Sequence, residues 1–470
     1  MFTLTDVYEA AGQEPPFDVE KVQIEAAHYD SRRVSEGMLF VALPGIREDG
    51  NDYISSAFEA GAAAALCTRA DASSPKDRQV VTPSPLQAFQ RLAARLRGRS
   101  SASFVAVTGS NGKTTTKQAL ASALGAAGPT LATERSENTD VGIPATLSRL
   151  HTKHQYAVLE MGAQTVGEIA GYCKFAQPNI SVITNIGTAH LGLFGSVDAV
   201  AHAKSEVLAA LPPGAPAVLY SEDSWTPWLR EHARGPVTTF GRGREADVQV
   251  SGFFLQKRVG TRVEMCIGNQ KFTVEVPDIV GPIDLGFGAA LATAVALDVD
   301  PEVAAKGLEN FEQAPHRMCA LELPGGSRLL DDTYNANRAS IVAALQTLRT
   351  MPRARRRIAV LGDMFELGQF APDEHRAAGR AASDVDQLIC VGALAQYFRE
   401  GAVAAGLPAT RVQLIAAETE STESIHAACQ QVASLLADSI LPGDLVLLKA
   451  SNSMKFAWIV DALTTSSGSR

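Results

Sequence analysis

Short apolar runs alternate with helical segments along the middle of the chain, from residue 99 to 313. The runs are four to seven residues long, are rich in Val and Ile, and cover Ser103–Thr108, Tyr156–Glu160, Ile180–Ile186 and Ala217–Tyr220. Runs that are apolar throughout are typical of parallel strands buried on both faces and joined by crossover helices. The pattern therefore predicts a central α/β domain built on a parallel sheet.

A different pattern occupies residues 247–276. Polar and apolar residues alternate there in three stretches, DVQVSGFF, TRVEMCI and KFTVEV. Alternation with a period of two residues indicates strands with one buried face. We therefore expect antiparallel hairpins appended to the central domain.

The α/β alternation resumes from residue 314. Strand-like stretches there are RLLDDTY, RRIAVLGDM, QLICVG, VQLIAA and DLVLLKAS, with helical segments such as Ser424–Ala437 between them. This order predicts a doubly wound α/β domain. The first 98 residues show a mixed α/β pattern that ends in a charged helical stretch suited to a linker. The predicted fold is thus α/β with three domains, 1–98, 99–313 and 314–470.

Composition narrows the class of protein. The 470 residues include 42 Lys and Arg against 51 Asp and Glu, a net charge of −9, which argues against a nucleic-acid partner. No apolar run reaches the length of a membrane span, and no basic segment followed by an apolar core opens the chain, so we expect no membrane insertion. The six cysteines are scattered singly, as in reduced thiols. These features predict a cytoplasmic protein.

A glycine-rich segment follows the first central strand and has the residues of a phosphate-binding loop. The common pattern, G-x-x-x-x-G-K-[ST], would need a glycine where the chain has Val107. An apolar strand nevertheless leads into a glycine turn and a helix that we expect to begin near Thr114. Backbone N–H groups there favour phosphate, the Lys113 ammonium would face the β/γ-phosphates, and the Thr114 hydroxyl would ligate Mg²⁺. The predicted nucleotide-binding residues of this loop are Thr108, Gly109, Ser110, Asn111, Gly112, Lys113, Thr114 and Thr115.

The spelling TGSNGKTTT resembles the shortened loop of the Mur ligase superfamily, T-G-[TS]-N-G-K-[TS]-T, in which the turn starts two residues later. Val107 is therefore no defect. Further stretches along nearly the whole chain resemble the branch of this superfamily that adds D-alanyl-D-alanine. They are residues 28–66, LEMGA (159–163), TNIGTAHLGLFGS (184–196), DDTYNAN (331–337) and LGDMFELG (361–368).

The resemblance implies a two-step ligase reaction with ATP and Mg²⁺ in peptidoglycan precursor synthesis. The terminal carboxylate of UDP-N-acetylmuramoyl-tripeptide would attack the γ-phosphate of ATP, and the amine of D-Ala-D-Ala would then displace phosphate from the acyl phosphate. Phosphoryl transfer to a carboxylate mainly needs positioning and charge neutralisation. The family plan puts the UDP-sugar on the first domain, ATP on the second and the amine near the third. We expect a monomer.

Two polar residues follow the ends of predicted central strands. Glu160 closes one buried strand, where an unpaired carboxylate would be costly, and His190 follows another. Open α/β sheets place ligands at the carboxyl ends of their strands. By resemblance, Glu160 and His190 join Thr114 as Mg²⁺ ligands, directly or through water, and act with Lys113 in catalysis. Taken without its context, His190 would be interpreted as a core or loop histidine. The matching TN-x-G-x-A-H context favours its interpretation as a metal ligand.

Lys204 lies in the predicted helix DAVAHAKSEVLAAL. The simpler interpretation is an exposed helical lysine. In Mur ligases the lysine of the matching A-K segment is carbamylated and can hold a second Mg²⁺, which makes Lys204 a candidate catalytic residue and metal ligand. Both interpretations stay open at this point.

The resemblance also implies contacts outside the loop. Arg317 would reach the ATP phosphates and Asp332 the ribose, although Asp331 could exchange roles with Asp332. Asn335 and Asn337 match the YNAN segment of the nucleotide site; their alternative is a pair of turn asparagines. For the UDP-muropeptide, the implied residues are Ser31, Arg32 and Asn138, where the guanidinium fork of arginine suits pyrophosphate oxygens.

The chain departs from the family pattern at several positions. Ser136 and Thr139 stand where asparagines are usual, and Ile283-Asp284 replaces a His-Asn pair. Arg338 stands in place of proline, and Asn452 ends a segment that usually reads K-G-S-R. These changes leave the ATP chemistry intact but concern the adenine contacts and the choice of peptide or amine.

Three other functions remain open. A Mur-superfamily ligase could join a different amine or UDP-muropeptide, and a non-catalytic protein could bind UDP-sugar and ATP as a sensor. The complete set of Lys113, Thr114, Glu160 and His190 argues against a sensor. A kinase or GTPase of another class is disfavoured, because neither a strict Walker motif nor a guanine-reading N-K-x-D motif is present.

Overall fold

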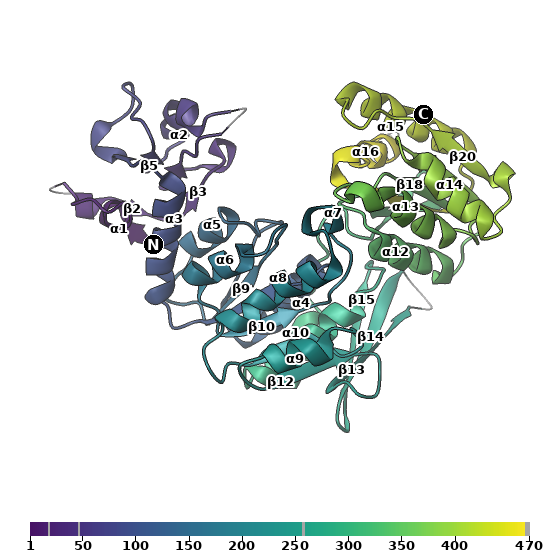
Figure 1. Cartoon of the computed structure of the whole chain (residues 1–470), viewed down its shortest axis with the longest axis horizontal. Helices are drawn as coiled ribbons and strands as arrows, with labels where there is room; N and C mark the ends of the chain where they lie inside the picture. Colours follow the sequence, from purple (N-terminus) through teal and green to yellow (C-terminus); the bar gives the residue numbers. More distant parts are fainter. Residues whose placement is uncertain (17–18, 46–47, 256–258, 466–470) are drawn as a thin grey trace.

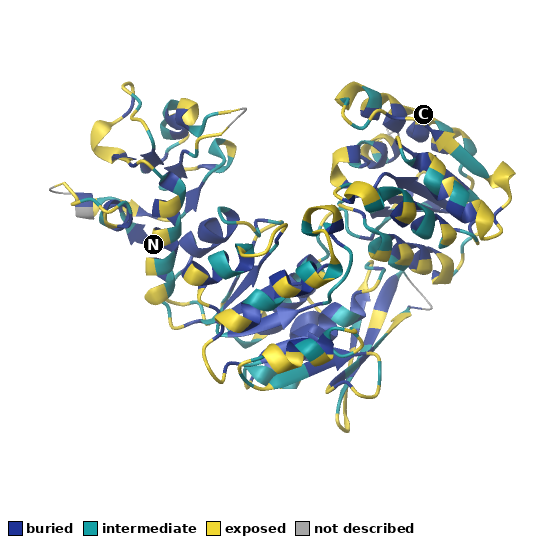
Figure 2. Cartoon of the chain, viewed as in Figure 1, coloured by how far each residue is buried: buried dark blue, intermediate teal, exposed yellow. Residues whose placement is uncertain are grey.

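The computed structural model describes residues 1–16, 19–45, 48–255 and 259–465. The chain has the outline of a V (Figure 1). The N-terminal part forms one arm, the largest sheet with its helices lies at the base, and the C-terminal part forms the other arm. Figure 2 shows that the sheets are buried and that exposed residues gather on the outer helices and loops.

The N-terminal arm contains a four-stranded parallel sheet in the order β3-β4-β5-β6 and an antiparallel pair, β1-β2. Helix α3 runs from this arm to the base and buries Phe89 and Leu92 on one face. The strands are β1 (Phe2–Thr3), β2 (Gln23–Ile24), β3 (Ala27–His28), β4 (Leu39–Val41), β5 (Ala64–Cys67) and β6 (Gln79–Val81), and the helices are α1 (Leu4–Ala10), α2 (Ile54–Glu59) and α3 (Pro85–Gly98).

The base is a nine-stranded sheet in the order β15-β14-β13-β12-β11-β10-β7-β9-β8. Strands β13 to β8 of this order pair in parallel, whereas β14 and β15 are antiparallel to their neighbours. The predicted hairpins therefore extend the parallel sheet as a meander. The bounds are β7 (Ser103–Thr108), β8 (Thr130–Ala132), β9 (Tyr156–Glu160), β10 (Ile180–Ile183), β11 (Ala217–Tyr220), β12 (Val237–Gly241), β13 (Val248–Phe254), β14 (Gly260–Ile267) and β15 (Gln270–Pro277).

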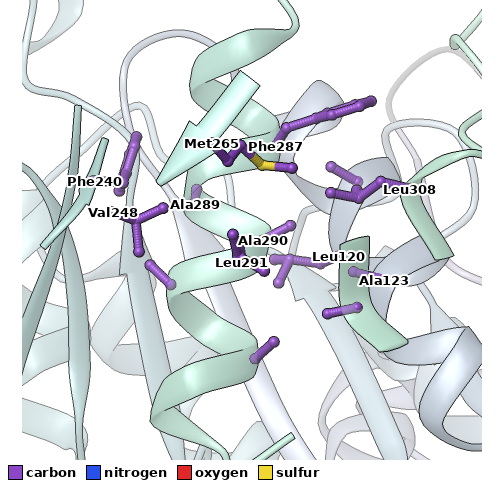
Figure 3. Packing of buried hydrophobic residues seen from close by; sticks show 14 of the residues in the cluster. Leu120, Ala123, Phe240, Val248, Met265, Phe287, Ala289, Ala290, Leu291 and Leu308 are labelled. Carbon is purple, nitrogen blue, oxygen red and sulfur yellow. The ribbon is translucent and has the colours of Figure 1, made fainter. Parts of the chain in front are cut away.

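Helices cover both faces of this sheet, because its parallel strands are apolar on both sides. Val105 and Val107 of β7 pack with α4, α10 and α11, where Leu120, Phe287 and Leu308 meet in one core (Figure 3). Phe104 and Ala106 face the opposite core with α5, α6 and α8. The helices are α4 (Lys113–Ala127), α5 (Gly142–Ser148), α6 (Glu168–Ala176), α7 (Leu191–Phe194), α8 (Val197–Ala210), α9 (Thr226–His232), α10 (Asp284–Ala296) and α11 (Pro301–Leu308).

The C-terminal arm is a six-stranded sheet in the order β16-β17-β21-β18-β19-β20, parallel except at β16. Helices α12, α13 and α14 pack on one face, and α15 and α16 pack on the other. The bounds are β16 (Cys319–Leu323), β17 (Ser327–Asp332), β18 (Arg357–Gly362), β19 (Gln387–Val391), β20 (Val412–Ile415), β21 (Leu445–Lys449), α12 (Arg338–Thr350), α13 (Ala371–Arg380), α14 (Ala395–Ala404), α15 (Thr422–Ser439) and α16 (Ala457–Thr465).

The predicted α/β fold, with its central parallel sheet, antiparallel extension and doubly wound C-terminal part, is confirmed. Strand β10 is shorter than expected: it ends at Ile183, because Thr184 and Asn185 leave the sheet to bind the neighbouring loop. The exact domain limits of 1–98, 99–313 and 314–470 stay a prediction. Among the described residues, no helix combines the length and apolar character needed to cross a bilayer.

Candidate active site

Two glycines shape the loop between β7 and α4. Gly109 has a φ of 144°, and a Cβ there would lie 1.9 Å from the Thr184 hydroxyl oxygen. Gly112 has a φ of 77° and caps the N-terminus of α4. Since L side chains rarely adopt such φ values, both positions need glycine. The helix begins at Lys113, one residue before the position expected from the sequence.

The segment after β10 holds this loop in shape. The Asn185 carbonyl accepts from the Ser110 N–H at 3.0 Å, and the Asn185 side-chain oxygen accepts from the Asn111 N–H at 2.9 Å. The Thr184 hydroxyl donates to the Asn111 carbonyl at 2.5 Å. Sequence reasoning singled out neither Thr184 nor Asn185, although both stand in the TNIGTAH stretch.

The hydroxyl groups inside the loop brace it against its neighbours. Thr108 donates to the Met161 carbonyl at 2.9 Å, and the Ser110 hydroxyl accepts from the Gly187 N–H at 2.8 Å. The Lys113 ammonium curls back and donates to the Gly109 carbonyl at 2.8 Å. Burial lowers the pKa of Lys113 from its ordinary value. The loop is thus preorganised, which suits a phosphate cradle.

Glu160 lies at the end of β9 with its side chain almost fully buried. Its Oε1 accepts from the Asn138 amide at 2.8 Å and from the Thr114 hydroxyl at 3.3 Å. Its Oε2 has no hydrogen-bond partner among the residues that the structure describes, and it lies 3.8 Å from the Lys117 Nζ. A buried carboxylate oxygen without a donor is costly unless a cation completes its environment.

This arrangement fits a bound Mg²⁺. Carboxylate and hydroxyl oxygens are its preferred protein ligands, and nucleotide phosphates usually supply others. The described residues contain no cluster of three or more His, Cys, Asp or Glu that could hold a metal by itself. The oxygen ligands that Glu160 and Thr114 offer therefore suit a metal ion that binds together with its nucleotide.

His190 caps the short helix α7 with a positive φ of 56°. Its Nδ1 forms a hydrogen bond with the carboxylate of Glu366, which comes from the C-terminal arm. That bond lowers the pKa of Glu366. Sequence reasoning included LGDMFELG as a signature but assigned no role to Glu366.

Lys204 is buried in α8, with 1% of its surface exposed. The interpretation as an exposed helical lysine is therefore wrong. Burial lowers the pKa of Lys204 to about 7, and the nearby Lys113 charge acts in the same direction. Its Nζ lies 5.9 Å from the centre of the Phe194 ring of α7. A large share of neutral amine at neutral pH suits the carbamate interpretation, which stays a prediction.

The neighbouring carboxylates Asp331 and Asp332 have different surroundings. Asp331 is buried and accepts from the His316 Nδ1 at 2.7 Å and from the Thr333 hydroxyl at 2.7 Å. Asp332 lines a cavity beside the loop and accepts from the buried Lys449 Nζ at 2.5 Å. Asp332 is thus better placed for a ligand than Asp331, and Lys449 holds it there.

The other C-terminal candidates approach the loop directly. The Arg317 guanidinium stacks on the Tyr334 ring at 4.0 Å from its centre. The Asn337 amide caps α12 and donates to the Asn111 side chain at 2.6 Å. The Asn335 side-chain oxygen accepts from the Ala336 N–H in a local turn, while the residue borders the site.

Two of the three predicted muropeptide-binding residues lie away from the loop. Ser31 and Arg32 belong to a 3₁₀ turn of the N-terminal arm, and Arg32 is exposed and paired with Asp30 at 2.8 Å. Arg32 holds the pKa of Asp30 at about 2. Asn138, in contrast, bonds the Glu160 carboxylate inside the site. Neither Ser31 nor Arg32 is among the residues that line the two large cavities described next, in the part of the chain that the structure describes.

Two cavities meet beside the loop. One has a volume of about 990 Å³ and extends toward α3 of the N-terminal arm. The other has a volume of about 630 Å³ and lies between the loop and the C-terminal arm. The residues that line both are Lys113, His190, Arg317, Tyr334 and Asn335.

The residues that depart from the family pattern form hydrogen bonds or ion pairs, or line the smaller cavity. Buried Asp284 forms a bidentate pair with Arg242, at 2.7 and 3.0 Å, and Ile283 lines the smaller cavity. Ser136 accepts from the Tyr334 hydroxyl across the two parts of the chain. The remaining changes are local: Thr139 accepts from the Gly142 N–H, Arg338 lies 3.3 Å from Glu374, and Asn452 borders the smaller cavity.

Fold and site together define a nucleotide-binding α/β protein with a second cavity next to the phosphate loop. Three family profiles match successive parts of the chain: the Mur ligase family catalytic domain over residues 23–97, the Mur ligase middle domain over 107–281, and the Mur ligase glutamate ligase domain over 316–452.

Curated relatives agree. The chain is 34% identical to UDP-N-acetylmuramoyl-tripeptide--D-alanyl-D-alanine ligase of Escherichia coli K12, over 79% of the chain and 82% of the relative. It is 31% identical to the enzyme of that name from Bacillus subtilis 168, over 95% and 94%. The chain belongs to the Mur ligase family.

Solved structures show the same architecture. A crystal structure of MurF from Acinetobacter baumannii matches with a TM-score of 0.82 and 30% identity, covering 98% of each chain. MurF from Thermotoga maritima, solved in complex with ADP, matches with a TM-score of 0.78 and 26% identity over 94% of this chain and 98% of that one.

Proposed function

We propose that the protein is an ATP-dependent, ADP-forming ligase that adds D-Ala-D-Ala to UDP-N-acetylmuramoyl-tripeptide during peptidoglycan precursor synthesis. The observation that carries the proposal is the meeting of two cavities at Lys113, one of them lined by the phosphate-binding loop. A nucleotide in the smaller cavity and a peptide carboxylate in the larger one would meet there. The names of the curated relatives support this choice of substrates.

The proposed reaction has two steps. A carboxylate oxygen of the tripeptide forms a bond to the γ-phosphorus of ATP while the bond to the β–γ bridging oxygen breaks, so ADP leaves. The amine of D-Ala-D-Ala then forms a bond to the acyl carbon while the bond from that carbon to the phosphate oxygen breaks. Inorganic phosphate leaves, and the amine loses a proton to solvent.

The residues of the loop would serve mainly to position and to neutralise charge. Lys113 would move from the Gly109 carbonyl to the transferred phosphoryl group, and Arg317 would face the same group. Glu160 and Thr114, together with His190, would hold Mg²⁺, which when bound neutralises the phosphate charge. Asp332, kept in place by Lys449, is the candidate for the ribose hydroxyls.

The remaining contacts follow from the cavities. Asn111, Asn335 and Asn337 would border the nucleotide from two parts of the chain, and Asn138 would orient the Glu160 carboxylate beside the muropeptide. Ser31 and Arg32 would bind the uridine diphosphate on the N-terminal arm. We further propose that the protein acts as a monomer in the cytoplasm; its six unpaired cysteines suit a reducing compartment.

The test measures ADP and phosphate release with each substrate left out in turn. We expect turnover only when ATP, Mg²⁺, the UDP-muramoyl-tripeptide and D-Ala-D-Ala are all present. Lys113→Ala should lower kcat on the order of 100-fold or more while the protein stays folded, because the ammonium stabilises charge that develops in the transition state. Turnover with L-amino acids and none with D-Ala-D-Ala would overturn the choice of amine.

A further inference from the structure

Glu366 of the C-terminal arm contacts His190 of the proposed metal site. His190 follows β10 at the base, and Glu366 follows β18 on the C-terminal arm. The His190 Nδ1 and the Glu366 carboxylate are hydrogen-bonded, and Gln164 of the base donates to the other carboxylate oxygen at 3.4 Å. Glu366 therefore bridges two parts of the chain that are 176 residues apart in sequence.

The two backbones are closely packed around this contact. The Gly192 N–H donates to the Glu366 carbonyl at 3.0 Å. A Cβ on Gly192 would lie 2.6 Å from the Gly368 nitrogen and 2.6 Å from the Leu367 carbonyl carbon. His190 and Glu366 both have positive φ values, 56° and 62°. Such conformations are costly for non-glycine residues and persist where the surroundings impose them, often at functional sites.

The bond determines which ring nitrogen of His190 can bind a metal. An ionised carboxylate only accepts hydrogen bonds, so the proton must lie on Nδ1 and the lone pair of the neutral ring on Nε2. Histidines that bind metals usually donate their other N–H to a carboxylate or a carbonyl, which fixes the tautomer and the ring orientation. His190 also lines both cavities, where the phosphates would lie.

We propose that Glu366 is a positioning residue for His190, so that the metal site is complete only when the C-terminal arm is docked on α7. The inference rests on the proposed function and adds a coupling between docking of the arm and metal binding. Metal–nucleotide binding would then favour the docked arrangement of the two parts, because their affinities are linked.

A second carboxylate provides a matched control. Glu374 also belongs to the C-terminal arm and also reaches the base, where its Oε2 accepts from the Thr188 hydroxyl at 3.4 Å. It contacts Arg338 of its own arm. In the part of the chain that the structure describes, it forms no hydrogen bond with His190. If docking alone mattered, loss of either carboxylate should have a similar effect.

The experiment measures Mn²⁺ binding to the 470-residue chain saturated with ADP, from the loss of the free-ion signal in electron paramagnetic resonance. We expect Glu366→Ala to weaken Mn²⁺ binding roughly 10-fold to 100-fold. Glu366→Gln, whose amide oxygen can still accept from Nδ1, should recover most of the affinity. Glu374→Ala should stay within about twofold of wild type, since it leaves the His190 ring in place.

A double-mutant cycle separates positioning from general destabilisation. In a His190→Ala background, Glu366→Ala should change Mn²⁺ affinity no further, because the ring that it orients is absent. The same loss in both backgrounds, or a wild-type affinity in Glu366→Ala, would overturn the inference while ligase turnover of the wild type upheld the proposed function. A wild type without ADP-dependent Mn²⁺ binding would overturn both.

Discussion

Three lysines, Lys117, Lys204 and Lys449, are among the largest fully buried side chains of the protein. Burial disfavours a charged ammonium, so a buried lysine is usually paired with an acceptor or has a lowered pKa. Lys117 donates to the Arg135 carbonyl at 2.8 Å and lies 3.8 Å from Glu160. Lys449 is paired with Asp332. Lys204 has no ion pair within the described part of the chain, which sets it apart as a group suited to chemical modification.

We predict that Lys204 carries a carbamate in the working enzyme. With a pKa of about 7, about half of its amine is neutral at pH 7 and can react with CO₂, and the anion formed could hold a second Mg²⁺. Lys204→Ala should be nearly inactive and partly rescued by short carboxylates, whereas Lys204→Arg should not be rescued. Wild-type protein in ¹³C-labelled bicarbonate should show a carbamate resonance that fades as the pH falls below 7. Wild-type turnover by Lys204→Ala would disprove the carbamate.

At the scale of elements, the ends of parallel strands bring the residues of the candidate site together. Thr108, Glu160 and Ile183 end the adjacent strands β7, β9 and β10, and Asp332 and Lys449 end the adjacent strands β17 and β21. The short helix α7 then joins the two sheets through His190. Each sheet thus supplies a rigid edge, and the chemistry depends on how these two edges face each other.

Asp363, the residue after β18, and His375 of α13 are buried titratable groups whose pKa values are shifted in opposite directions. Burial raises the pKa of Asp363 to about 6 and lowers the pKa of His375 to about 4. The His375 Nε2 accepts from the Met364 N–H at 3.0 Å, which favours the neutral ring. Burial is the main cause of both pKa shifts. Replacing Asp363 should therefore leave the pKa of His375 lowered, and replacing His375 should leave the pKa of Asp363 raised.

We predict that Asp363→Asn makes the C-terminal arm more sensitive to acid. His375 then binds fewer protons in the folded state than in the unfolded state between pH 4 and 6.5, so stability falls as the pH drops through that window, by at most about 1.4 kcal/mol per pH unit. His375→Asn should change the slope in the opposite direction, because Asp363 binds more protons when folded between pH 3.8 and 6. Urea unfolding followed by Trp458 fluorescence, with Trp225 and Trp228 replaced by Phe, measures both slopes. Parallel slopes for wild type and both variants would contradict this account.

At the scale of the whole molecule, the larger cavity draws on all three parts of the chain. Gln87 and Arg91 of α3, Glu160 at the base, and Tyr334 and Asn335 of the C-terminal arm all line it. The two arms of the V lie on either side of the base (Figure 1). A ligand that contacts both arms should therefore draw them together.

We predict that saturating UDP-N-acetylmuramoyl-tripeptide and a non-hydrolysable ATP analogue together reduce the radius of gyration. The reduction follows because the ligands bind the compact arrangement better than the open one. Small-angle X-ray scattering measures it, with ADP alone as the comparison. An unchanged radius of gyration, with binding of both ligands verified by calorimetry, would show that the cavity is already complete in the free protein.

The amino-acid sequence by itself determined the features that depend on residues close together along the chain. The strand, glycine turn and helix around Lys113 follow from local pattern, as do β7, β9 and β11, whose predicted bounds match the structure. The sequence pattern predicts no individual strand in the first 98 residues and does not predict β8, β12 or β16, because TLA, VTTFG and CALEL contain no apolar run of about four residues, the signal that identifies a buried strand.

The tertiary structure alone decided which distant residues meet. The pairing of His190 with Glu366, the bond between Asn111 and Asn337, and the burial of Lys204 depend on how helices and sheets pack. Residues that far apart leave no periodic signal in the chain, and the helix pattern around Lys204 suits an exposed face and a buried one alike. Burial is a property of the packed elements, and it is what turns an ordinary lysine into a candidate reactive amine.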